Sequence, residues 1–162
     1  MAVPAFFEAL QTSPLGLEIS GSIWLFPTIE TIHVFALSVV VGSIAIVDLR
    51  LLGLAFKDKA VTAVSREYLP WTWGAFGLAV VSGLLLFVSR AADYLAIAPF
   101  LIKFVFMGLA ALNMVVFHLL TWRSVETWDQ GAPASGAKIA GLLSLVFWAI
   151  VIVLGRKVGF SL

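Results

Sequence analysis

The sequence contains no cysteine, so disulfide bonds, thiolate-held iron–sulfur clusters and thiol catalysis are excluded. Charged residues are scarce: they make up 12% of the 162 residues, about half of what a soluble domain carries. The net charge of +1 argues against nucleic acid as a partner. No Walker or dinucleotide-type glycine pattern is present, so nucleotide chemistry is not indicated. The first 21 residues have no basic start and no long apolar run, so we expect no signal peptide.

Apolar sequence fills most of the chain. Hydrophobic residues make up 62% of it, and the mean hydropathy is +1.09. Four apolar runs reach the roughly 17–25 residues that are needed to cross a bilayer. We predict membrane spans at about 23–50, 71–89, 98–122 and 138–156.

The segment before the first span has a different character. Residues 4–20 place Phe6 and Phe7 on one side of a short helix, which is typical of a segment lying on a membrane surface. The sequence therefore predicts an all-α integral membrane protein. We expect a single domain over residues 1–162, a bundle of four transmembrane helices with a short N-terminal interfacial helix.

Basic residues are distributed unevenly between the predicted connections. The connections after the first and third spans hold Arg50, Lys57, Lys59, Arg66, Arg123 and Lys138. The opposite side holds only Arg90, Arg156 and Lys157. By the positive-inside rule, both longer connections lie in the cytoplasm and both termini lie outside. We expect a multi-pass protein of the bacterial inner membrane with periplasmic termini, a polar connection at 57–70 and a short loop at 90–96.

The first span carries ionisable residues at both ends. An ionisable residue kept inside a span is costly in lipid, which makes it a candidate functional residue. Glu30 and His33 stand at the head of this span, and Asp48 and Arg50 stand at its foot. We interpret His33 as a ligand or proton-handling group, because the next three turns carry no other ionisable residue. Glu30 could instead cap the first turn, and Asp48 and Arg50 could pair at the cytoplasmic boundary.

The third span carries a second polar stripe. Lys103, Met107, Met114 and His118 lie 4, 7 and 4 residues apart, which places them within a stripe roughly 60° wide. Facing stripes would give a seam suited to a porphyrin, with imidazole or thioether for the iron and cations for the propionates. Lys103 could also snorkel to the interface, His118 could be an ordinary interfacial residue, and the methionines could simply pack.

The two histidines are predicted at different depths. If the first span starts near Pro27 and the third near Ala98, His33 and Lys103 lie at the same level. At 1.5 Å per residue, His118 lies about 22 Å further in. A haem with two histidine ligands needs both at one level, so the two histidines do not obviously meet within one subunit.

Small residues indicate where helices can approach closely in lipid. The second span offers Ala75, Ala79, Ser82 and Gly83, and the third offers Gly108 and Ala111. Interfaces of this kind also favour self-association, so we expect a homo-oligomer.

The chain resembles the bacterial superfamily of small haem-associated membrane bundles that includes the HemJ-type protoporphyrinogen oxidases and the CopD-type copper-resistance membrane domain. It resembles more closely an uncharacterised bacterial family of four-span proteins. The matching stretches are Trp24 to Pro27, Glu30-Thr31, His33-Val34, Gly42, Asp48 to Gly53, Lys103 and His118. In the HemJ type, a first-span histidine and a later-span lysine are associated with haem b. The resemblance implies these roles for His33 and Lys103, and places Arg50 where that pattern has a basic residue.

The leading hypothesis is an inner-membrane haem b protein for electron transfer or redox sensing. Its cofactor-binding candidates are His33, Lys103, His118, Met107, Glu30 and Arg50. His33 is the expected first iron ligand, and the second could be His118 (in a second site or across a subunit boundary), Met107, Lys103 or no residue. One alternative is a HemJ-like protoporphyrinogen oxidase in which Glu30 or Lys103 handles protons. A second is a non-enzymatic transporter or scaffold, including copper handling, although three methionines and two histidines give no soft-ligand cluster. We expect the lipid bilayer as surroundings and a quinone or another membrane redox protein as partner.

Overall fold

The computed structural model describes residues 4–161, whose regular elements are all helices joined by short connections, with no strand in this range. Four helices are long and apolar enough to cross a membrane, which confirms the predicted all-α, four-helix architecture. They are α3 (Leu25–Leu51), α4 (Val61–Ser89), α6 (Ala98–Val116) and α7 (Ser135–Ser161). The third of these continues beyond α6 through a π-helical turn, η1 (Phe117–Thr121), and a 3-10 turn, η2 (Trp122–Thr127).

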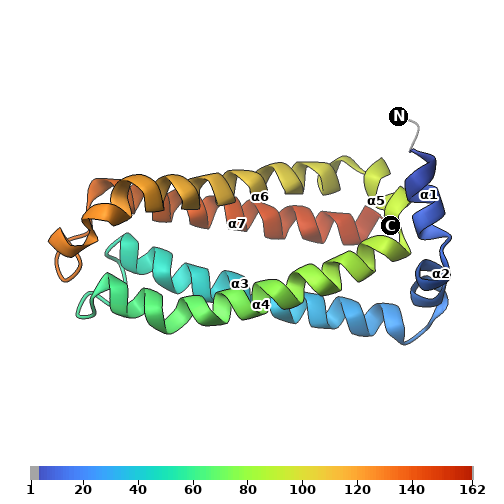
Figure 1. Ribbon diagram of the computed structural model, residues 1–162, viewed down its shortest axis with the longest axis horizontal. Coiled ribbons are helices and arrows are strands. Elements are labelled where there is room, and N and C mark those ends of the chain that lie inside the picture. The colour runs from blue at the N-terminus through green and yellow to red at the C-terminus, as the bar shows by residue number, and fades with distance from the viewer. Residues whose placement is uncertain (1–3, 162) are drawn as a thin grey trace.

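The four long helices form two pairs (Figure 1). Helix α3 packs along α4, helix α6 packs along α7, and α3 also packs on α7, which joins the pairs. Within the described part of the chain, α4 and α6 do not pack along each other. The bundle is therefore closed on three sides and loosely joined on the side between α4 and α6.

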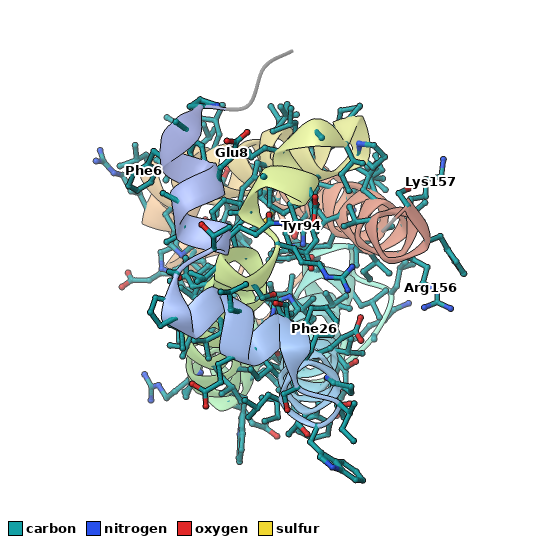
Figure 2. All side chains as sticks on the ribbon, turned by 90° about the vertical axis from the view of Figure 1, so that its right-hand side faces the viewer. Phe6, Glu8, Phe26, Tyr94, Arg156 and Lys157 are labelled. Atoms are coloured by element: carbon teal, nitrogen blue, oxygen red, sulfur yellow. The ribbon has the colours of Figure 1, made fainter. Side chains whose placement is uncertain are left out.

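Three short helices cover the end of the bundle where both termini lie: α1 (Ala5–Gln11), α2 (Pro14–Gly21) and α5 (Ala91–Ala96). The predicted interfacial helix over 4–20 is thus two helices, and Ser13 starts the second by accepting a bond from Gly16 N at 3.2 Å. Gln11 joins α1 to α5, because its Nε2 donates to Asp93 Oδ2 at 3.1 Å and its Oε1 accepts from Ala92 N at 2.8 Å. Figure 2 looks onto this end, with Tyr94 near its centre.

Helix α4 starts earlier than the sequence predicts. The segment 57–70 is expected to be a polar connection and the span to begin near Trp71, yet the helix begins at Val61 and runs through Pro70. Asp129 explains the early start: its Oδ1 accepts from Thr62 N at 2.8 Å, and its Oδ2 from Thr62 Oγ1 at 2.7 Å. This cap comes from a residue far away in the sequence. The predicted loop at 90–96 is likewise wrong, since it contains α5.

Arg50 holds the opposite end of the bundle together. Its side chain is 1% exposed, and Nε donates to the Lys59 carbonyl at 2.7 Å and Nη2 to the Asp129 carbonyl at 3.1 Å. It therefore ties the α3–α4 connection to the segment before α7. The expected pairing with Asp48 is not formed; the one ion pair among the described residues joins Lys59 and Glu67 at 3.2 Å.

Candidate functional site

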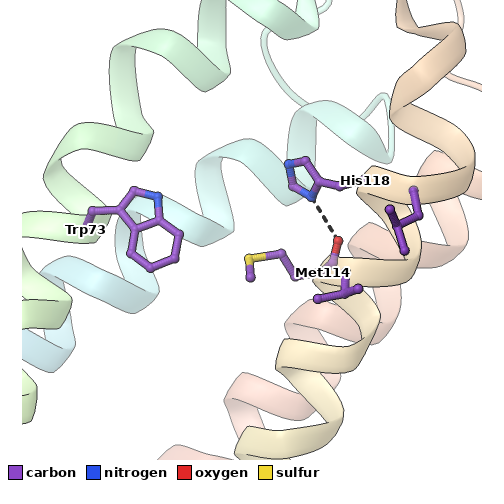
Figure 3. A pocket seen from close by; sticks show the side chains of 5 residues that line it. Trp73, Met114 and His118 are labelled. Carbon is purple, nitrogen blue, oxygen red and sulfur yellow. Dashed lines mark hydrogen bonds between the residues drawn. The ribbon is translucent and has the colours of Figure 1, made fainter.

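A cavity of about 310 Å³ opens between α4 and the third spanning segment. It is lined by Trp73 of α4 and by Met114, Val115, His118 and Leu119. Figure 3 shows Trp73 on one side and Met114 and His118 on the other, with the Met114 sulfur directed towards the indole. The lining is apolar apart from the imidazole. The volume of the cavity is at the lower end of the range for ligand and cofactor sites, which is about 300–1,000 Å³.

The His118 ring is oriented by the backbone of its own helix. Its Nδ1 lies 2.8 Å from the Met114 carbonyl oxygen (Figure 3). A carbonyl oxygen can only accept, so Nδ1 carries the proton, and in the neutral ring Nε2 keeps its lone pair. Metal-binding histidines commonly have this arrangement, with one ring nitrogen fixed by a carbonyl and the other left for the metal.

A local change of helix type surrounds His118. The α-helical pattern ends at Val116, and the next five residues, Phe117–Thr121, form a π-helical turn. Such turns are rare and occur frequently at functional sites. The ring also lies near two aromatic neighbours, Phe117 at 5.3 Å and Trp122 at 5.7 Å between ring centroids. These neighbours restrict the ring positions that His118 can adopt.

His33 occupies a different place, in the α3–α4 interface. Its Nδ1 lies 3.0 Å from Ser82 Oγ, and that oxygen lies 2.7 Å from the Leu78 carbonyl. The serine has one proton, which it donates to the carbonyl, so His33 donates through Nδ1 and keeps a lone pair on Nε2. The ring lies against Gly83, where a Cβ atom would be 3.0 Å from the imidazole Cε1. The glycine therefore makes room for the histidine.

The other predicted site residues are dispersed. Lys103 lies close enough to His33 for its charge to act on that ring. Met107 is half-buried on α6 and does not line the cavity. Glu30 is exposed at the end where the termini lie, near enough to act on Tyr94. Arg50 lies in the last turn of α3 at the opposite end, where its Nε and Nη2 donate to backbone carbonyls of the two connections.

Tyr94 is a buried polar group that the sequence reading did not single out. It stacks on Phe100 and Phe87 with centroid separations of 5.1 and 6.4 Å. Burial raises the pKa of its phenol, and the nearby Arg90 guanidinium opposes that rise. No local pattern separates this tyrosine from an ordinary interfacial one, because its burial depends on Phe87, Phe100 and Val158, which come from three different helices.

The two histidines belong to separate levels of the bundle. His33 contacts α4 at Ser82, whereas the His118 cavity contacts α4 at Trp73. Those positions differ by nine residues of one helix, or about 14 Å along its axis. The sequence expectation of unequal depths agrees with this placement, although the separation measured along α4 is smaller than the predicted one.

The residues present fit a haem better than a bare metal ion. Within residues 4–161, no three or more His, Asp or Glu side chains gather in a way that could hold a metal ion. A haem iron is held mainly by its porphyrin and takes only one or two protein ligands. His118 meets that need with a free Nε2 beside an apolar cavity. Met114 is on the same helix face as His118, one turn earlier, so these two cannot ligate an iron from opposite sides.

No protein-family model, curated protein or solved structure matches this chain.

Proposed function

We propose that the chain is a membrane haem b protein that transfers or senses electrons, with His118 as the residue of this chain that would hold the iron. The observation that carries the proposal is the His118 ring. Its Nδ1 is fixed on the Met114 carbonyl, and its Nε2 is left free beside an apolar cavity. The open side between α4 and α6 would let a macrocycle larger than the cavity extend along the groove.

Haem, when bound, would supply an iron that gains and loses one electron. The chain's own residues would control its surroundings. The Met114 carbonyl orients the imidazole, and Trp73, Met114 and Leu119 place apolar surface beside it. A hydrophobic shell of this kind sets solvent access and thereby the reduction potential.

The proposal extends to the surroundings and partners of the chain. Four apolar helices indicate a lipid bilayer, and we propose the bacterial inner membrane with both termini in the periplasm, on the positive-inside argument. One chain offers one histidine at this level, so the His118 of each chain would hold one haem, and the proposed homo-oligomer rests on the small residues of the helix faces. A quinone or another membrane redox protein is the proposed electron partner, because the cavity opens between two lipid-exposed helices.

A second candidate is a HemJ-like protoporphyrinogen oxidase. The proximity of Lys103 to His33 favours it, because these are the two residues that the resemblance associates with haem b. Here the haem would bind at the outer level, and Lys103 or Glu30 would handle protons. The two candidates differ in which histidine holds the iron.

The test is a reduced-minus-oxidised visible spectrum of the detergent-purified protein beside two single variants. We expect His118→Ala to lose the haem b bands and His33→Ala to keep them. The reverse result would move the iron to the outer level and support the oxidase. Loss of the bands in both variants would mean that the histidines share a haem across subunits. A wild type that stays colourless with haem supplied would rule out both haem functions. The remaining hypothesis would then be a non-enzymatic transporter or scaffold, including copper handling.

A further inference from the structure

Asp48 is a buried carboxyl group that the proposed haem site does not use. It lies on α3 beside α7, and it is 5% exposed. Its Oδ2 is the one buried side-chain oxygen or nitrogen in the described residues that has no hydrogen-bond partner. The helices meet at Gly141 of α7, where a Cβ would lie 3.0 Å from the Asp48 carbonyl oxygen and 3.2 Å from Leu51 Cβ.

Among residues 4–161, no ion pair includes this carboxyl. Arg50 follows on α3, but residues two apart on a helix point in different directions, and its Nε and Nη2 donate to carbonyls of the connections. The charged groups on the neighbouring helices, Arg66 and Glu67 of α4 and Lys138 of α7, are exposed. The polar side chain that faces Asp48 from α7 is Ser144.

Around the carboxyl the packing is apolar. Val47 and Leu51 on α3 belong to the hydrophobic cluster at this end of the bundle, together with Ala137 and Ala140 of α7. Transferring an unpaired carboxylate into such surroundings is far more costly than transferring a neutral acid. A bound cation would remove the charge, but hard cations take about six or more oxygen ligands, and Asp48 with Ser144 supplies too few.

We propose that Asp48 is a proton-binding site in the α3–α7 interface, where the carboxyl carries its proton at neutral pH while the helices are packed. Release of the proton would leave an uncompensated charge that only water entering between α3 and α7 could solvate. Proton release and separation of these helices near Gly141 are therefore linked. Asp48 lies one turn from the end of α3, so the proton would exchange with the aqueous side at the Arg50 end. This inference does not depend on the proposed haem.

The test is infrared spectroscopy of the full chain in lipid nanodiscs at neutral pH. We expect the wild type to show the C=O stretching band of a protonated carboxylic acid, shifted in D2O. The band should be lost completely in Asp48→Asn and kept in Asp58→Asn, a control aspartate in the exposed α3–α4 connection. If the asparagine variant does not fold, Asp48→Glu replaces it in the test, because this change keeps an acid at position 48. The C=O band of Asp48→Glu should persist at a frequency different from that of the wild type.

Three results would overturn the proposal. The first is a wild type without the band, which would mean that the carboxyl is ionised. The second is a band that survives in Asp48→Asn and so belongs to another acid. The third is a wild-type band that disappears when sodium or potassium ions are added, which would make the site a cation site.

Discussion

Replacing Arg50 by methionine should destabilise the fold substantially, because this side chain links both connections at one end of the bundle. The change keeps the length and apolar stem but removes the donors to the carbonyls of Lys59 and Asp129. A buried acceptor left without a partner costs about 1–3 kcal/mol. Two acceptors near the bundle end, where water can partly replace the donors, give a loss of about 3 kcal/mol.

For a chain of this length, each kcal/mol corresponds to a shift of about 2–4 °C in the unfolding temperature. Arg50→Met should therefore unfold about 6–12 °C below the wild type in the same detergent. Arg50→Lys should fall between the two, because a single ammonium cannot span both carbonyls. The control is Arg66→Met on the exposed face of α4, which should change stability by less than about 0.5 kcal/mol. An Arg50→Met protein as stable as Arg66→Met would refute the linking role.

Three further predictions concern other contacts. Gly83→Val should destabilise the protein by about 1–3 kcal/mol in thermal unfolding, because the valine side chain would collide with the His33 ring. The control is Gly42→Val, since a Cβ at Gly42 meets nothing within 4 Å. Equal effects of the two changes would contradict the close approach of Gly83 to His33. Asp129→Ala should lower the free energy of unfolding by about 0.5–2 kcal/mol, because it removes the cap on Thr62. Amide hydrogen exchange at the start of α4 should become faster, and unchanged or slower exchange there would count against the capping role. Tyr94 should ionise at higher pH than a free phenol in an absorbance titration, with Tyr94→Phe as the reference. Because burial raises the pKa of Tyr94, the stability that this residue contributes should be complete below about pH 10 and should fall as the pH rises further. A Tyr94 titration at or below the ordinary range would contradict its burial.

The arrangement of the spans follows from local sequence, but the connections between them do not. Apolar runs of spanning length predict four helices, and all four are present. The start of α4 at Val61 depends on Asp129, a partner that no local pattern reveals. The sequence also suggests pairing of Asp48 with Arg50, although positions two apart on a helix do not face each other.

Small residues were a partial guide to helix contacts. Gly83 and Ser82 lie where α4 meets His33, as the sequence predicts for that face. On the third span Gly108 and Ala111 are both exposed within the chain and Ala110 is the buried residue, so a close approach at the first two stays a prediction for contacts with another copy. Small side chains are permitted on lipid-facing positions as well as on contacts, so composition cannot choose between neighbouring faces.

The sequence identifies candidate site residues, but it does not show which of them lie together in the structure. Equal depth of His33 and Lys103 follows from counting residues, and Lys103 lies near enough for its charge to act on the His33 ring. The π-helical turn at Phe117–Thr121 leaves no clear mark in the sequence, yet it surrounds the histidine that lines the cavity. No local pattern shows that Nε and Nη2 of Arg50, predicted as a cofactor residue, donate to backbone carbonyls of Lys59 and Asp129.

The most direct test of the proposed haem function is the haem content of the wild-type protein. The purified chain, expressed with haem supplied, would be assayed for haem b by its pyridine complex and for protein by amino-acid analysis. The proposal predicts about one haem b per chain, since each chain presents one His118 beside the cavity. A protein that contains no haem and takes up none on titration would contradict it.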